Sequence, residues 1–168
     1  KGSTIRSVWI DTAPMMDKYR NNSATYPDAC KQDLQKQLSW IDSVLTNAKE
    51  DWIIVAGHHP IYAETSKEDS ERLDMQKRLD PILRKHKVDM YICGHIHNFQ
   101  HIRIPGSNID YVVNSAGSLA RKVKPTEGTV FCSPEPGFSV ISADKKTLTL
   151  RMIDKKGNIL HTVTRNSQ

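Results

Sequence analysis

The sequence predicts an α/β fold in which strand–helix units are followed by a β-meander, one half of a layered α/β sandwich. Three observations predict it. The apolar runs at 51–56 and 88–93 are each followed by a glycine and a histidine. Amphipathic helical patterns precede both runs, as expected of βαβ units. After residue 97 the chain changes to short alternating segments separated by turn residues.

The composition is that of one soluble globular domain. The chain has 168 residues, of which 38% are hydrophobic and 26% charged, enough to bury a core. The formal net charge of +5 is scattered, without a basic run interleaved with aromatic residues. No apolar run approaches the ~20 residues that span a bilayer. The mild positive charge fits attraction of an anionic substrate but is more often simply a soluble surface, and we expect no nucleic-acid partner and no membrane span.

The first strand is expected at 5–12 and ends near the carboxylate of Asp11. Residues 13–29 are rich in Pro, Asn, Ser and Tyr, which is typical of a loop. A helix is expected next, with Asp28 as its N-cap after Pro27. Its apolar stripe recurs at spacings of three and four residues: Leu34, Leu38, Ile41, Leu45 and Ala48.

After the second strand at 51–56, the polar stretch 63–70 is expected to form a surface loop. A second helical segment is expected over 71–86, with four apolar residues facing inward: Leu73, Leu79, Ile82 and Leu83. Pro81 either kinks this helix or is the first helical residue behind Asp80 as N-cap.

The remaining strands follow the third apolar run. They are expected at 99–104, 111–114, 137–142, 148–153 and 159–163. Hairpin turns at 144–146 and 155–158 join the last three. Residues 122–136 are expected to form a long loop.

The residues that carry chemistry are histidines at strand ends. His58 follows Gly57 and the second strand, and His95 and His97 follow Gly94 and the third strand. Glycine lets the backbone turn sharply and pass close to whatever the imidazoles hold. Because the carboxyl ends of neighbouring parallel strands lie together, we expect these three imidazoles to ligate metal.

The other histidines and the cysteines have simpler interpretations. We expect His86, His101 and His161 to be structural or surface residues. The three cysteines have no CxxC spacing, which excludes zinc-ribbon and thioredoxin-type motifs. Cys93 is expected to be buried, while Cys30 and Cys132 lie in loop-like surroundings and would pair only in an oxidising compartment.

The two histidine segments, Val55-Ala56-Gly57-His58 and Gly94-His95-Ile96-His97, resemble the last two sequence blocks of the calcineurin-like metallophosphoesterases. The similarity is greatest to purple acid phosphatases of the tartrate-resistant type. Two further segments resemble the corresponding stretches of that type: Ile10-Asp11-Thr12 and His97-Asn98-Phe99-Gln100. The resemblance implies a four-layer α/β/β/α sandwich with mixed sheets. It also implies a dinuclear centre that hydrolyses phosphate monoesters with a metal-activated water.

The resemblance implies that His58 and His95 bind a divalent ion (Fe, Zn or Mn) and that His97 binds Fe(III). It also implies a secreted, periplasmic or lysosomal location. The family's earlier blocks, DxG, GDxxY and GNH, do not occur in the chain. Residues 1–168 therefore resemble the C-terminal portion of a single domain, and the missing N-terminal half becomes an expected partner. Three neutral imidazoles do not offset two polyvalent cations, so we expect this chain alone to be inactive.

The loop after His58 departs from the family, whose tartrate-resistant members carry a substrate-contacting histidine within the stretch that here is 63–67. Lys67 is a candidate cation for phosphate, Glu64 for proton transfer, and His59 for contact either with a metal ligand or with phosphate. Asn98 is a candidate for orienting a metal ligand. Solvated loop residues are the alternative for Lys67 and Glu64. Two other functions remain open: a phosphodiesterase or nucleotide-cleaving relative, and a catalytically incompetent half-domain kept as a binding or structural module.

Overall fold

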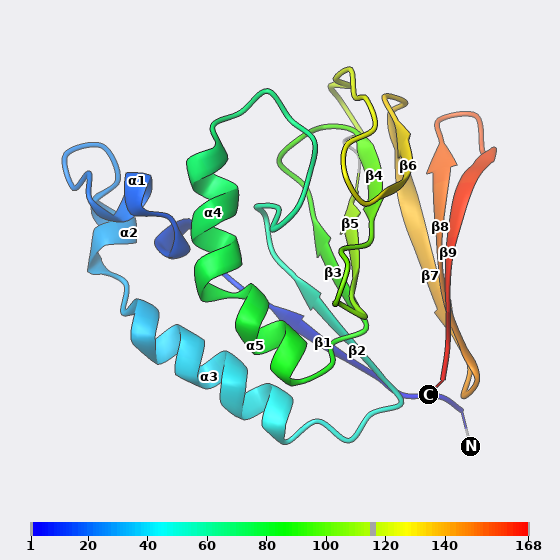
Figure 1. Cartoon of the computed structure of the whole chain (residues 1–168), viewed down its shortest axis with the longest axis horizontal. Helices are drawn as coiled ribbons and strands as arrows, with labels where there is room; N and C mark the ends of the chain where they lie inside the picture. Colours follow the sequence, from blue (N-terminus) through cyan, green and yellow to red (C-terminus); the bar gives the residue numbers. More distant parts are fainter. Residues whose placement is uncertain (1, 115–116, 168) are drawn as a thin grey trace.

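The computed structural model describes residues 2–114 and 117–167, which form three layers (Figure 1). Helices cover one face of a six-stranded sheet, and a three-stranded sheet packs on its other face. The predicted α/β class with mixed sheets is confirmed. A layer of helices over the outer face of the second sheet would complete a four-layer sandwich.

The larger sheet has the strand order β1-β2-β3-β5-β4-β6. Its strands are β1 (Ile5–Trp9), β2 (Trp52–Ala56), β3 (Met90–Cys93), β4 (Phe99–Ile102), β5 (Asp110–Val113) and β6 (Thr129–Ser133). The pairs β1–β2, β2–β3 and β3–β5 are parallel, and β4 is antiparallel to both of its neighbours. The carboxyl ends of β1, β2 and β3 therefore meet at one edge of the sheet.

The smaller sheet is an antiparallel meander of β7 (Gly137–Ala143), β8 (Thr147–Asp154) and β9 (Ile159–Asn166). The two predicted hairpin turns lie between these strands. Asp144 and Asp154 stabilise them, because each carboxylate accepts hydrogen bonds from backbone N–H groups of its turn.

The helical layer consists of one 3₁₀ turn and five α-helices. They are η1 (Ala13–Met15), α1 (Asp17–Arg20), α2 (Pro27–Lys31), α3 (Leu34–Thr46), α4 (Asp69–Arg78) and α5 (Asp80–Lys85). The longest, α3, buries Leu34, Ile41 and Leu45 of the predicted stripe. Among the described residues, no helix is long and apolar enough to cross a membrane.

Two apolar cores hold the layers together. One lies between the helices and the larger sheet and contains Ile41, Val55 and Tyr91. The other lies between the sheets and contains Trp52, Met90 and Leu150. Neighbouring residues of a strand enter different cores, as the two-residue period of a strand requires.

Several predicted boundaries are wrong. Asp28 lies within the first turn of the short α2, while the N-cap of α3 is Asp33, whose Oδ1 accepts a hydrogen bond from Lys36 N at 3.0 Å. The predicted loop at 13–29 contains η1, α1 and α2. The predicted loop at 122–136 contains β6, which completes the larger sheet beside β4. These elements are short and depend on tertiary contacts, so local composition does not show them.

The predicted helix over 71–86 is two helices, α4 and α5, with Leu79 between them. Pro81 lies in the first turn of α5, which agrees with a helix start there. The side chain of Asp80 does not cap helix α5. The Asp80 carboxylate instead accepts hydrogen bonds from Tyr62, Arg84 and Tyr111. Leu73 was expected to face inward but is 60% exposed, because the buried face of helix α4 is formed by Glu71 and Met75.

Two of the histidines expected to be structural lie in a polar network between the sheets, in which His101 and Asp110 are buried. His101 Nδ1 lies 2.9 Å from His161 Nε2, and His101 Nε2 lies 2.7 Å from Asp110 Oδ1. Arg103 and Arg165 donate to the same carboxylate. Because His161 and Arg165 belong to β9, this network ties the smaller sheet to β4 and β5.

The cysteines are all free thiols, and Cys93 is buried as expected. The Sγ atom of Cys30 lies 2.8 Å from the carbonyl oxygen of Arg20.

Candidate metal centre

The site lies where β2 and β3 end side by side. Hydrogen bonds continue their pairing beyond the strands: Gly57 N donates to Ile92 O at 3.0 Å, and Gly94 N donates to His58 O at 3.1 Å. Both histidine segments therefore leave the same edge of the sheet in register. This places His58 and His95 in contact, as predicted.

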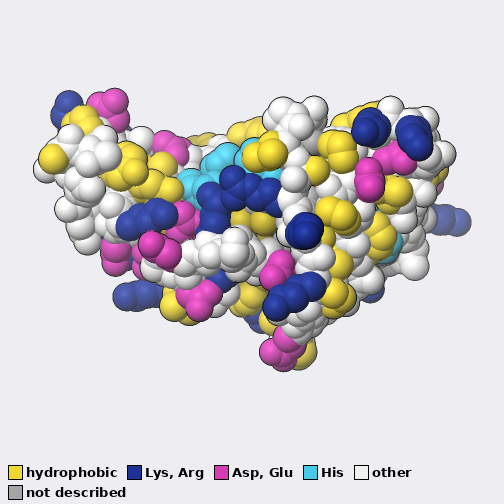
Figure 2. Space-filling model, turned by 90° about the horizontal axis from the view of Figure 1, so that it is seen from above, with side chains coloured by type: hydrophobic (Ala, Val, Ile, Leu, Met, Phe, Trp, Pro, Cys, Tyr) yellow, Lys and Arg dark blue, Asp and Glu magenta, His cyan; other side chains and the backbone are white. Residues whose placement is uncertain are grey.

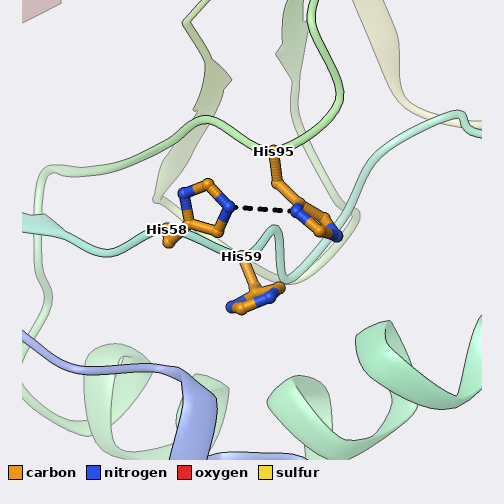
Figure 3. Close-up of side chains that lie close together, drawn as sticks. All are labelled: His58, His59 and His95. Carbon is orange, nitrogen blue, oxygen red and sulfur yellow. Dashed lines mark hydrogen bonds between the residues drawn. The ribbon is translucent and has the colours of Figure 1, made fainter.

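Three imidazoles converge at this edge: His58, His59 and His95 (Figure 3). Their ring centroids are 4.4 to 4.9 Å apart, and one potential ligand atom from each lies within 4.8 Å of the others. The tightest approach is 3.0 Å between His58 Nε2 and His95 Nδ1. Nitrogens bound to one zinc ion in a tetrahedral site are about 3.3 Å apart, so this pair has nearly the separation that an ion requires.

The position of Gly57 is fixed by close packing. A Cβ atom there would lie 2.6 Å from Thr12 Cγ2 and 2.8 Å from Tyr91 Oη. Gly94 is different, because its nearest neighbour would be His58 Nδ1 at 4.0 Å. The sharp turn expected at Gly94 is instead made by the histidines themselves.

His95 and His97 both have left-handed backbones, with φ of 68° and 65°. Such a conformation costs a non-glycine residue about 1–2 kcal/mol. The turn is held by hydrogen bonds from Ile96 N to Gly94 O at 2.8 Å and from Arg121 N to His97 O at 2.9 Å. A backbone strained at two histidines in one short turn is typical of a functional site.

His97 is not a member of the three-histidine cluster, but it lies near enough that its charge lowers the pKa of His58. Its Nδ1 atom is buried and has no hydrogen-bond partner among the described residues. A buried nitrogen without a partner is costly unless a ligand binds it. His97 therefore has a free ligand atom beside the cluster.

His95 Nε2 faces two competing partners. It lies 2.9 Å from Glu71 Oε2 and 3.0 Å from Lys67 Nζ. A proton on Nε2 can be donated to the carboxylate, whereas an unprotonated Nε2 can accept from the lysine. When Nε2 carries the proton, the Nδ1 lone pair is free and faces His58. When Nε2 is unprotonated, the proton is on Nδ1. Only the tautomer bonded to Glu71 can ligate metal through Nδ1.

Glu71 was missed in the sequence because it lies in a charged stretch of helix α4 that has the composition of a surface. In the structure it is 2% exposed and also accepts from Lys18 and from Tyr19. Burial alone would raise the pKa of Glu71, but hydrogen bonds from Lys18 and the nearby charge of His95 lower it to about 2. The ionised form of the carboxylate is therefore favoured beside His95.

Burial favours the neutral form of the clustered imidazoles. It lowers the pKa of His58, with help from the charges of Lys67 and His97, and it lowers the pKa of His95. Burial and the charges of His95 and His58 lower the pKa of His59 to about 3. Neutral imidazoles keep the lone pairs that a metal ion binds.

The other candidate residues have varied surroundings. Asn98 is buried, and its Oδ1 accepts from Gln100 Nε2 at 2.8 Å. The backbone of Glu64 is held by two hydrogen bonds with the Gln100 side chain. Burial, followed by the negative charge of Glu64, raises the pKa of Cys132 on β6. Among the described residues, Lys67 contacts the cluster through His95 Nε2, and the side chain of Glu64 makes no hydrogen bond to it.

The histidines reach the surface beside a band of lysine and arginine side chains (Figure 2). Next to them, a cavity of about 770 Å³ opens between the two sheets and has His58 at one end. Its walls are largely apolar and include Ile5, Trp9 and Ile141. The site thus combines neutral nitrogen ligands, cations beside them and an adjacent apolar opening.

Comparison with known proteins identifies relatives across this site. Residues 8–99 match the sequence model of the calcineurin-like phosphoesterase family. Purple acid phosphatase 3 of Arabidopsis thaliana is 30% identical over 165 residues, which cover 91% of this chain and 44% of the relative. Tartrate-resistant acid phosphatase type 5 of Mus musculus is 31% identical over 170 residues, covering 94% of this chain and 51% of the relative. The chain thus spans about half the length of these relatives.

Solved structures agree on the fold. Plasmodium GAP50, described as the anchor in the inner membrane complex, superposes with a TM-score of 0.81 at 23% identity, covering 100% of this chain and 53% of GAP50. The purple acid phosphatase PPD1 of yellow lupin superposes with a TM-score of 0.70 at 20% identity, covering 96% of this chain and 31% of that enzyme. At these identities the superpositions establish the metallophosphoesterase fold alone.

Proposed function

Because this chain belongs to the calcineurin-like phosphoesterase family, we propose that the protein containing it hydrolyses phosphate monoesters. Its relatives named purple acid phosphatases and tartrate-resistant acid phosphatases match over most of the chain, as the sequence motifs predicted. The observation that carries the proposal is the convergence of His58 Nε2 and His95 Nδ1, 3.0 Å apart at the ends of neighbouring parallel strands.

The residues fit the histidine part of a dinuclear metal centre of the family's type, whose carboxylate ligands would come from residues outside this chain. His58 and His95 present neutral nitrogens toward one point, and His97 has a buried Nδ1 without a hydrogen-bond partner among the described residues. In the proposed centre His58 and His95 hold a divalent ion (Fe, Zn or Mn) and His97 holds Fe(III). When bound, such a pair lowers the pKa of a water to yield hydroxide and stabilises negative charge on the phosphoryl group.

The chain's own residues prepare this site and its substrate contacts. The Glu71 carboxylate accepts a hydrogen bond from the protonated Nε2 of His95, and this keeps the Nδ1 lone pair available as a ligand. In that tautomer Lys67 loses its contact with His95 and is free to bind a phosphate oxygen as a point charge. Lys67 thus takes the place of the loop histidine of tartrate-resistant relatives. His59 is proposed to contact phosphate or the metal, Asn98 to orient a ligand and Glu64 to assist proton transfer.

The rest of the domain is proposed to come from residues outside these 168. Apolar side chains are exposed on the edge strands of both sheets, including Trp9 of β1, at 76%, and Phe138 of β7, at 52%. Three such side chains, Ile5 and Trp9 of β1 and Ile141 of β7, line the 770 Å³ cavity between the sheets. Covering this edge would bury the apolar surface and add carboxylate ligands beside the histidines. We therefore propose that the chain alone does not turn over substrate.

A direct assay tests this function on the full-length protein. We expect hydrolysis of p-nitrophenyl phosphate at acidic pH and little hydrolysis of bis-p-nitrophenyl phosphate. The opposite preference would indicate the phosphodiesterase or nucleotide-cleaving alternative. His97→Ala should remove iron and any purple colour, whereas His58→Ala should lose the divalent ion and activity while iron stays. Retention of colour in His97→Ala would refute the assignment of His97 to iron.

A binding or structural module is the second candidate function. The sequence of these 168 residues contains none of the DxG, GDxxY and GNH blocks. GAP50, which has the same fold, is described as an anchor. A full-length protein that carries these blocks and releases phosphate would exclude this candidate. The location proposed from the family is secreted, periplasmic or lysosomal, and fractionation of cells that express the full-length protein tests it.

A further inference from the structure

We propose that His59 is a third imidazole ligand, which completes with His58 and His95 a site for one divalent ion that this chain binds by itself. The inference rests on the proposed function for His58 and His95 as ligands and adds His59, which the family motifs do not include. A three-histidine site with an open position suits zinc or cobalt.

The geometry places His59 at the third corner of the cluster (Figure 3). Its ring centroid is 4.4 Å from that of His95 and 4.8 Å from that of His58. One nitrogen of each ring lies within 4.8 Å of the other two, whereas bound nitrogens are about 3.3 Å apart. In the proposed site the rings move closer together to close this difference. The three rings therefore already surround one volume.

The partner of His59 determines which of its nitrogens can be the ligand. Its Nδ1 lies 2.7 Å from Thr12 Oγ1, which also accepts from the His59 backbone N–H at 3.2 Å. When Nδ1 carries the proton, it donates to Thr12 and leaves the Nε2 lone pair for the ion. Such an outer hydrogen bond is usual for a metal-bound histidine. Glu71 has the same role for His95, since Glu71 Oε2 lies 2.9 Å from His95 Nε2.

The surroundings hold His59 in place before an ion binds. The side chain is 5% exposed, and the Tyr91 hydroxyl donates to the His59 carbonyl oxygen at 2.7 Å. His58 is exposed, so the open coordination position faces solvent and is accessible to water or a phosphate oxygen. His97 lies outside this cluster and remains available for the second ion.

Cobalt(II) titration of the chelator-treated chain tests the inference, because tetrahedral cobalt has strong visible absorption. We expect one Co²⁺ per chain, displaced by Zn²⁺. His59→Gln should weaken binding by about 100-fold or more, and Thr12→Val by about tenfold through loss of the outer hydrogen bond. His97→Gln should keep the cobalt spectrum. His161→Gln is the matched control because it removes a histidine of the distant inter-sheet network.

The inference is overturned if His59→Gln binds Co²⁺ with wild-type affinity and spectrum, or if His97→Gln loses the spectrum instead. Thermal unfolding of each metal-free variant checks that it is folded. If His59→Gln does not fold, Thr12→Val decides, and wild-type affinity in that variant overturns the inference. A full-length protein that shows the cobalt site but releases no phosphate contradicts the proposed function and leaves this site intact.

Discussion

Glu71 Oε2 lies 2.9 Å from His95 Nε2, on the side of the imidazole opposite to the nitrogen that faces His58. A buried carboxylate in this position selects the tautomer with a proton on Nε2. The metal-binding capacity of His95 therefore depends on a residue of helix α4, which is distant in sequence from the histidine segments.

Replacing this carboxylate tests its positioning role. Glu71→Gln should lower the affinity of the chain for Zn²⁺ by about 10- to 100-fold, because the amide accepts the Nε2 proton less strongly than a carboxylate. Competition with a chelating dye measures this. Glu68→Gln, at the exposed start of the same helix, should bind Zn²⁺ like the wild type. Equal affinities for both variants would contradict the role of Glu71.

Lys67 should have the opposite effect on metal binding. Its contact with His95 Nε2 favours the tautomer that cannot ligate through Nδ1. Lys67→Met should therefore raise zinc affinity, by about twofold if the two tautomers are equally populated. In the full-length enzyme the same variant should raise KM for a monoester. Lys67→Arg keeps the cation and is the control. A fall in zinc affinity in Lys67→Met would refute the competition.

Gly57 should not tolerate a side chain. A Cβ there would meet Thr12 Cγ2 at 2.6 Å and Tyr91 Oη at 2.8 Å, and Tyr91 cannot move without losing its hydrogen bond to His59. Gly57→Ala should lower the free energy of unfolding by about 1–3 kcal/mol, measured with urea. Gly117→Ala is the control, since no atom lies within 4 Å of the Cβ built there. Equal stability of the two variants would show that the packing is loose.

His161 should make the fold less stable in acid. Burial, then the charges of His101 and Arg103, lowers the pKa of His161 below its ordinary value. The unfolded chain therefore takes up a proton at His161 below about pH 6.5, while the folded chain resists it. Stability is lost as the pH falls through this range. Between pH 7 and pH 5, His161→Gln should lose less unfolding free energy than the wild type in urea titrations. An equal or larger loss would contradict this sign.

Much of the fold followed from the sequence because strong periodic patterns mark its long elements. The strands at β2, β3, β8 and β9 and the buried stripe of α3 were predicted in place. The short elements were not, since β6 and α2 are stabilised by neighbours rather than by local pattern. The Asp28 cap failed because Asp33, five residues later, makes the capping bond.

For the site, glycine–histidine segments after strands indicated that His58 and His95 would lie close together, and the structure brings them to 3.0 Å; their ligation of metal stays a prediction. The sequence did not show Glu71, because a carboxylate in a polar helix is usually solvated. It also did not show that His95 and His97 have left-handed backbones, since only glycine signals such a conformation in sequence. Thr12 is another missed neighbour, because its contact with His59 joins loops 47 residues apart.

The measurement that tests the metal centre most directly is anomalous X-ray diffraction at the zinc edge from crystals of the protein grown with Zn²⁺. The structure predicts one strong peak about 2.1 Å from both His58 Nε2 and His95 Nδ1, with His59 turned toward it. A peak only at other histidines, or no peak at saturating Zn²⁺, would contradict the metal centre.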